Sequence, residues 1–288
     1  MLRREPFLIS TDSIGDTHVR SSITLITDAA ELAGSGQAAV LGCGRGTEIP
    51  AHHLSRTFDQ VDLLDLNADA LDALKIECQS FAEPDDSCIF HLADITGLIS
   101  QIEPIAREIV RKAVHPLQCL DALGLLLTST APKFWRPPGN YRYKLVVCSA
   151  VLTQLQATVR KRVESIFLNR FPEHISALSL SKSWREQIWK FARNLEDAFI
   201  NHLESLSAPN GIIYLSDTVH VCWLLQTASS GLTTEGSWIA TRTSRLADYL
   251  RPWYEIVIER EWSWLRREQE GSYWGRLYGV QAIVYRLP

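Results

Sequence analysis

Residues 40–50 read VLGCGRGTEIP, an apolar run that breaks into three glycines within five positions. Glycine has no Cβ and adopts positive φ at little cost, so a glycine-rich corner between a strand and a helix opens backbone N–H groups to a ligand. The positive end of the helix dipole lies at the same corner. We therefore expect Gly42, Gly44 and Gly46 to form a nucleotide-type site. Their spacing is GxGxG, whereas dinucleotide sites are typically GxGxxG, and Thr47 stands where that third glycine would be.

Short apolar runs alternate with helical patterns along the chain. The runs that we interpret as strands cover residues 38–43, 61–66, 88–94, 143–151 and 211–217. Helical spacing predicts helices over 17–33, from about Glu48, over 67–81 and over 184–206. Residues 253–265 and 273–287 are β-rich, and the short polar turn between them predicts an antiparallel hairpin. Two segments, 128–140 and 227–238, have the composition of loops.

This alternation predicts an α/β fold. Strand, helix, strand order is typical of right-handed crossovers and a parallel sheet. We expect a doubly wound, mostly parallel seven-stranded sheet with helices on both faces and the antiparallel hairpin at the C-terminal end. The domain is expected to cover residues 37–288, with helical insertions at about 95–142 and 151–208, after an N-terminal helical cap at 1–36.

Composition favours a cytoplasmic globular protein. The 29 basic and 33 acidic residues leave a net charge of -4, which gives no overall attraction to nucleic acid or to a membrane surface. The six cysteines include no CxxC pair and are expected to be free thiols in a reducing compartment. No signal peptide and no membrane-spanning run is recognisable. His52 and His53 are adjacent on a helical pattern and cannot share a face, so we expect no metal site.

Acidic residues close the second and third apolar runs. Asp65 follows Gly46 by nineteen positions and can accept hydrogen bonds from both hydroxyls of a ribose. Asp94 closes the next run. Because the carboxyl ends of parallel strands meet at one edge of the sheet, both acids should face the glycine corner. An adenosine-containing ligand is therefore predicted.

At this point the sequence resembles the class I S-adenosylmethionine-dependent methyltransferases. The matching motifs are VLGCGRG (40–46), VDLLDLN (61–67), LADIT (92–96) and LVVCSAVLTQL (145–155). The terminal hairpin also looks like the reversed last strand of that family. The resemblance covers residues 37–155 by motif and the rest by pattern only, and it is specific for the cofactor rather than for the acceptor.

The resemblance implies that the glycine corner holds the methionine part of S-adenosylmethionine. The residues involved would be Gly42, Cys43, Gly44 and Gly46, and Ser149 would lie beside the sulfonium. S-adenosylhomocysteine would be the product.

The resemblance also implies an adenosine half of the site. Asp65 would bind the ribose hydroxyls, and Leu66 and Asn67 would flank the adenosine. Asp94 would accept a hydrogen bond from the adenine amine, with Ile95 against the ring.

Methyl transfer is an in-line displacement that mainly requires alignment of donor and acceptor, and it needs a base only when the acceptor carries a proton. We expect His220, with Asp217, to supply that base, because both lie close to the end of the fifth apolar run. The thiol of Cys148 lies within an apolar strand, where burial raises the pKa, so we do not expect it to act as a nucleophile.

Several functions remain open at this level. We expect a small-molecule acceptor, with an RNA or protein methyltransferase as an alternative that the basic run Arg160, Lys161, Arg162 would serve. A non-catalytic S-adenosylmethionine-binding or scaffold protein is a second alternative, and a nicotinamide-linked oxidoreductase a third.

Overall fold

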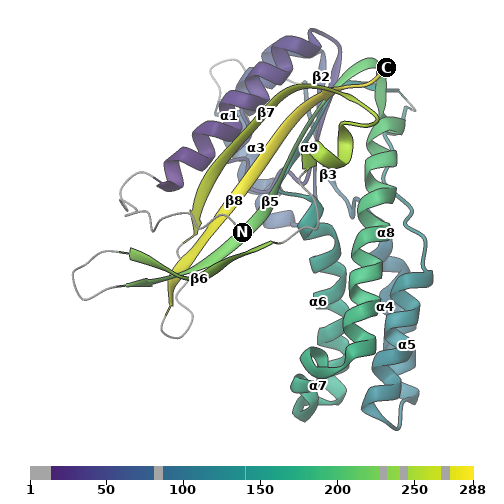
Figure 1. Ribbon diagram of the computed structural model, residues 1–288. Coiled ribbons are helices and arrows are strands. Elements are labelled where there is room, and N and C mark those ends of the chain that lie inside the picture. Colours follow the sequence, from purple (N-terminus) through teal and green to yellow (C-terminus); the bar gives the residue numbers. More distant parts are fainter. Residues whose placement is uncertain (1–13, 81–86, 140, 227–231, 241–245, 267–272) are drawn as a thin grey trace.

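The computed structural model describes residues 14–80, 87–139, 141–226, 232–240, 246–266 and 273–288. Over these ranges a single eight-stranded sheet forms the centre of the molecule (Figure 1). Seven strands follow the order β3-β2-β1-β4-β5-β8-β7, and β6 pairs with β5 beside this path. The strands are β1 (Gln37–Leu41), β2 (Gln60–Asp65), β3 (Cys88–Leu92), β4 (Tyr143–Ser149), β5 (Ser207–Gln226), β6 (Leu232–Ala240), β7 (Glu255–Arg266) and β8 (Tyr273–Arg286).

The parallel half of the sheet is as predicted. β1 pairs in parallel with β2 and β4, β2 with β3, and β4 with β5. Strands of this kind are buried on both faces and therefore read as continuous apolar runs rather than as an alternation. The predicted terminal hairpin is also confirmed, since β7 and β8 are antiparallel and β8 is antiparallel to β5.

Two segments differ from the sequence prediction. β5 was expected to end at Asp217 but continues to Gln226, because β8 and β6 pair with its outer part. Residues 227–238 were expected to form a loop, whereas their described part, from Leu232, belongs to β6. Paired strands far along the chain override the local composition here.

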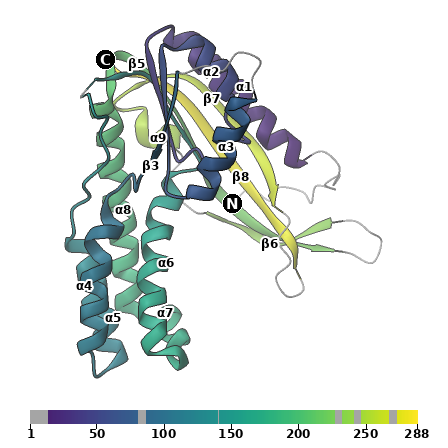
Figure 2. The ribbon, with the colours of Figure 1, turned by 180° about the vertical axis from the view of Figure 1, so that it is seen from behind.

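Helices cover both faces of the sheet, as predicted (Figures 1 and 2). One face carries α1 (Ile14–Ala33), α2 (Ala51–Thr57) and α3 (Ala68–Gln79), whose side chains form one hydrophobic core with the sheet. The other face carries α4 (Leu98–Lys112), α5 (Pro116–Ser129), α6 (Leu152–Arg170), α8 (Lys182–Leu206) and α9 (Leu246–Leu250). A 3-10 turn (Pro172–His174) and α7 (Ile175–Leu180) connect α6 to α8.

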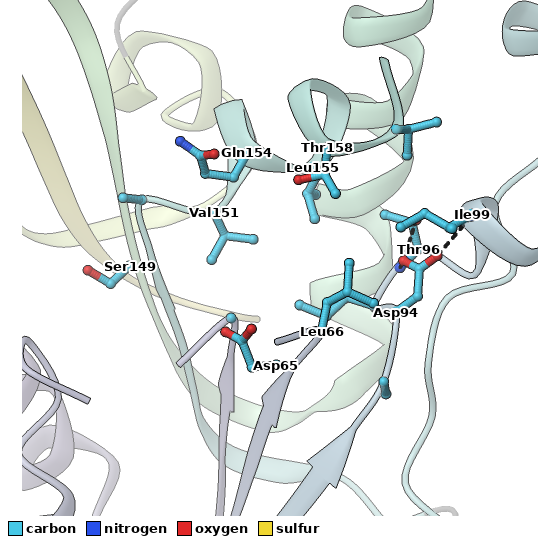
Figure 3. A pocket seen from close by; sticks show the side chains of 15 residues that line it. Asp65, Leu66, Asp94, Thr96, Ile99, Ser149, Val151, Gln154, Leu155 and Thr158 are labelled. Atoms are coloured by element: carbon cyan, nitrogen blue, oxygen red, sulfur yellow. Dashed lines mark hydrogen bonds between the residues drawn. The ribbon is translucent and has the colours of Figure 1, made fainter. Parts of the chain in front are cut away.

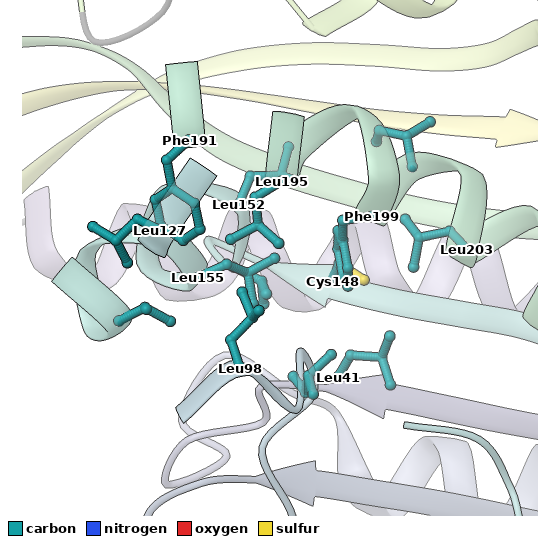
Figure 4. Packing of buried hydrophobic residues seen from close by; sticks show 14 of the residues in the cluster. Leu41, Leu98, Leu127, Cys148, Leu152, Leu155, Phe191, Leu195, Phe199 and Leu203 are labelled. Atoms are coloured by element: carbon teal, nitrogen blue, oxygen red, sulfur yellow. The ribbon is translucent and has the colours of Figure 1, made fainter. Parts of the chain in front are cut away.

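The second core is the larger of the two and extends from the sheet into the helices. Leu41 and Cys148 of the sheet pack with Leu152 of α6 and with Phe199 and Leu203 of α8 (Figure 4). The apolar stripe of α8 therefore has a structural role. Among the described residues no helix is both long and apolar enough to cross a membrane.

Candidate functional site

A cavity of about 240 Å³ lies where the carboxyl ends of β1, β2, β3 and β4 meet the first turns of α6 (Figure 3). Six of the ten predicted cofactor residues line it: Gly42, Asp65, Leu66, Asp94, Ile95 and Ser149. Val151, Gln154, Leu155, Thr158 and Val159 line its opposite wall, with Ile99 of α4. The other four predicted residues, Cys43, Gly44, Gly46 and Asn67, do not line the cavity, although Gly44 and Asn67 hydrogen-bond to Asp65.

Asp65 is held in place by two backbone groups. Its Oδ2 accepts a hydrogen bond from the N–H of Gly44 at 2.7 Å, and its Oδ1 accepts one from the N–H of Asn67 at 2.8 Å. A carboxylate has about four lone-pair sites, so each oxygen keeps one for a ligand. The carboxylate is thus oriented at the cavity wall and can still receive two donors, as a pair of ribose hydroxyls would supply.

The glycine corner differs from the sequence expectation. The N–H groups of Gly42 and Cys43 bond to the carbonyl of Leu64 at 2.8 and 2.9 Å, and the N–H of Gly46 bonds to the carbonyl of Cys43 at 3.0 Å. With Gly44 bonded to Asp65, these four N–H groups serve the protein rather than a ligand. The helix was predicted to begin at about Glu48, but α2 begins at Ala51.

Backbone conformation and close packing explain the glycines. Gly42, Gly44 and Gly46 have φ of 73°, 53° and 77°, in the left-handed region. A Cβ at Gly46 would lie 2.3 Å from Cδ1 of Leu74 on α3, and one at Gly42 would lie 2.8 Å from Cγ2 of Val151 at the cavity. A Cβ at Gly44 would meet open space.

We therefore predict different costs for two alanine substitutions. Gly44→Ala should lower the free energy of unfolding by about 1 kcal/mol, from the left-handed backbone alone. Gly46→Ala should cost about 2–4 kcal/mol, because the buried side chain of Leu74 must also shift and overpacking adds about 1–3 kcal/mol to the backbone cost. Denaturant unfolding of both variants measures the difference. Equal losses would show that the contact with Leu74 relaxes freely.

Asp94 lines the cavity and also organises the start of α4. Its Oδ1 accepts hydrogen bonds from the N–H and Oγ1 of Thr96 at 2.9 and 2.7 Å, and its Oδ2 accepts one from the N–H of Ile99 at 2.9 Å (Figure 3). One lone pair of Oδ2 is left for a ligand donor. This capping function was not predicted from the sequence, although an acid just before a helix is a known signal for it.

Ser149 joins the cavity to two residues that the sequence analysis missed. Its hydroxyl donates to Oε2 of Glu48 at 2.9 Å, and Oε1 of Glu48 lies 3.0 Å from Nε2 of His18 on α1. The next residue, Ala150, has φ of 53° and lines the cavity. A left-handed non-glycine residue is a strained feature that is frequent at functional sites. Only the position of Glu48, two residues after Gly46, could have drawn attention to it.

The two residues that were predicted to supply the catalytic base, His220 and Asp217, both lie on β5. His220 was expected just beyond the end of a strand but lies within β5, opposite Gly279 of β8 and Ala240 of β6. Asp217 is fully buried and accepts a hydrogen bond from Oγ1 of Thr153 at 2.9 Å. Neither residue is among those that line the cavity.

The cysteines near the site are poor nucleophiles. Cys43 and Cys148 are buried. Burial, with a contribution from the charge of Asp65, raises the pKa of the Cys43 thiol to about 12, and burial raises that of Cys148 as well. Both thiols are therefore protonated near neutral pH. The described residues include no group of three or more histidine, cysteine or acidic side chains placed to hold a metal ion.

Comparison with known proteins gives structural likenesses only. No family model and no curated protein matches the chain. Among solved structures, the N-methyltransferase NodS from Bradyrhizobium japonicum WM9 is 10% identical, with a TM-score of 0.44, over 95% of this chain and 98% of NodS. The chain is similar in structure to methyltransferases.

Two further structures show the same degree of likeness. A putative methyltransferase from Bacillus halodurans C-125 is 10% identical with a TM-score of 0.47, over 93% of this chain and 99% of its own. Magnesium protoporphyrin IX methyltransferase from Synechocystis PCC 6803, solved with bound SAM, is 11% identical with a TM-score of 0.41. The match covers 97% of this chain and 86% of that enzyme. At such identities and TM-scores the likeness assigns neither an activity nor a site residue to this chain.

Proposed function

We propose that this chain is a class I S-adenosylmethionine-dependent methyltransferase that acts on a small molecule. The observation that supports this most directly is the position of the cavity. The strand order reverses between β1 and β4, and the cavity lies at the carboxyl ends of these two strands. Open α/β sheets bind their ligands at this point.

The donor groups around the cavity fit the cofactor. Asp65 has two lone pairs for the ribose hydroxyls and Asp94 has one for the adenine amine, with Ile95 against the ring. Leu66 would flank the adenosine, and the missing Cβ of Gly42, which would otherwise lie 2.8 Å from Cγ2 of Val151, leaves room for the methionine part. Gly44 and Asn67 act indirectly in this proposal, through Asp65.

In this proposal the chain aligns reactants rather than supplying covalent chemistry. The cofactor, when bound, provides an activated methyl group on a sulfonium. Ser149 lies at the β4 side of the cavity, and the apolar side chains of Val151, Leu155 and Ile99 exclude water from the opposite wall. Positioning and exclusion of water account for most of the acceleration in such a displacement.

The RNA alternative receives no support from the basic run on α6. Arg160 is paired with Glu164 at 3.5 Å, and Arg162 with Glu103 at 2.9 Å. Surface charges that already have partners within the protein are poorly placed to neutralise phosphates. The proposal therefore keeps a small-molecule acceptor.

Titration calorimetry with S-adenosylmethionine and S-adenosylhomocysteine tests the proposal. We expect saturable 1:1 binding of both ligands. If neither ligand binds at about 1 mM, the binding free energy of each is weaker than about −4 kcal/mol, and the proposal is overturned. A parallel fluorescence titration with NADH should show no binding. Saturation by NADH instead would favour the oxidoreductase alternative.

A further inference from the structure

Glu48, which is not among the predicted cofactor residues, accepts a hydrogen bond from Ser149, and Ser149 lines the cavity. Glu48 lies between the glycine corner and α2, and 23% of its side chain is exposed. Its two oxygens face different partners: Oε2 accepts from the hydroxyl of Ser149 at 2.9 Å, and Oε1 faces Nε2 of His18 at 3.0 Å. Glu48 is thus fixed directly behind a residue that lines the cavity.

The partner histidine carries no compensating charge. Nε1 of Trp262 is 2.8 Å from Nδ1 of His18, and an indole nitrogen can only donate. Nδ1 must therefore be the unprotonated acceptor, which leaves a neutral ring with its proton on Nε2, toward Glu48. The ring is 1% exposed and stacks on Trp264 with centroids 4.3 Å apart. This packing holds the tautomer.

Glu48 is ionised in this setting. Its Oε2 accepts the hydroxyl proton of Ser149 and its Oε1 faces the N–H of His18, and both contacts favour the carboxylate over the protonated acid. Nε2 of His18 is outside hydrogen-bond geometry despite its short distance, so the contact is an electrostatic one. Among the described residues no lysine or arginine pairs with Glu48. A largely buried negative charge without a positive partner is costly and is typical of functional sites.

The sheet order indicates which part of the ligand would meet this charge. With the adenosine at Asp65 and Asp94, on β2 and β3, the rest of the cofactor extends across β1 to β4, where Ser149 lies. We propose that Glu48, behind Ser149, is an anionic subsite for the positively charged sulfur, and that it makes the site prefer the sulfonium donor over the neutral thioether product. This inference rests on the proposed function.

Glu48→Gln tests the subsite, since glutamine keeps the shape and removes the charge. We expect about a tenfold loss of affinity for S-adenosylmethionine and less than about a twofold change for S-adenosylhomocysteine, because only the former carries the sulfonium charge. Calorimetry with both ligands measures the two Kd values. Glu31→Gln, an equal change of charge at an exposed position of α1, is the matched control and should change neither.

The outcomes separate the two proposals. Binding of neither ligand to the wild-type protein would overturn the proposed function itself. Equal losses for both ligands would assign Glu48 to a group that they share, such as the α-ammonium, and would overturn the sulfonium assignment. Unchanged affinities would also overturn it while leaving the proposed function intact. Should Glu48→Gln not fold by circular dichroism, Glu48→Ala removes the same charge and leaves room for water beside His18 and Ser149, with the same expected ratio.

Discussion

Replacement of Asp62 by alanine is expected to lower the free energy of unfolding by about 3–5 kcal/mol, because two hydroxyls each lose a hydrogen bond to a charged group, which contributes about 1.5–3 kcal/mol. Asp62 is fully buried on β2 and accepts hydrogen bonds from the hydroxyls of Tyr141 and Tyr143, both at 2.6 Å. Its Oδ1 also accepts a hydrogen bond from Nε2 of Gln60 at 3.1 Å and lies 2.8 Å from Nε2 of His91. Alanine would leave the buried hydroxyl of Tyr143 without its acceptor and would remove one hydrogen-bond partner from each of the partly exposed residues Tyr141, Gln60 and His91.

Tyr141→Phe provides the matched control for this cluster. It removes one hydroxyl, which also contacts Gln60, and leaves the carboxylate with its other partners. The expected loss is about 1.5–3 kcal/mol, the contribution of one hydrogen bond to a charged group. Denaturant unfolding of both variants gives the comparison. A loss for Asp62→Ala no larger than that for Tyr141→Phe would show that water satisfies the remaining donors.

The second large effect concerns ligand affinity. Asp65→Ala should weaken binding of S-adenosylhomocysteine by about 1–3 kcal/mol, about 5- to 140-fold in Kd, through unmade hydrogen bonds. Part of the loss would come from the ribose hydroxyls. Another part would come from the N–H groups of Gly44 and Asn67, which would lose their acceptor. The glycine corner would then no longer be held in its orientation by Asp65.

Asp72→Ala, at an exposed position of α3, is the control for this loss and should leave the Kd unchanged. Titration calorimetry at constant ionic strength compares the two variants, because net charge alone affects steering of a charged ligand. If Asp65→Ala binds as tightly as the wild-type protein, the ribose assignment is wrong.

The parallel part of the fold could be predicted because its signals are local. An apolar run such as residues 61–66 is bounded by its own turn residues, and a strand buried on both faces shows this in its own composition. The long β5 could not be delimited in this way. Its outer part is stabilised by β8 and β6, which lie later in the chain, so the pairing decides where the strand ends.

The candidate site shows the same division. Asp65 and Ser149 end strands and Asp94 follows the end of β3 by two residues, and strand ends can be counted from the sequence; all three residues line the cavity. The contacts of Glu48 depend on a histidine thirty positions upstream on α1, which no spacing rule connects to it. His220 was misplaced for the same reason as the end of β5, because it belongs to the strand and not to a segment beyond it.

The contact between His18 and Trp262 spans 244 positions of the chain. At the usual rate of about 5–20 residues per second, a ribosome takes roughly 12–50 s to add that much polypeptide. Throughout this interval α1 has been made, while the strand that carries Trp262 does not yet exist. Glu48 can then receive its fixed histidine only near the end of translation, although the apolar core of α1 with β1 and β4 can form earlier.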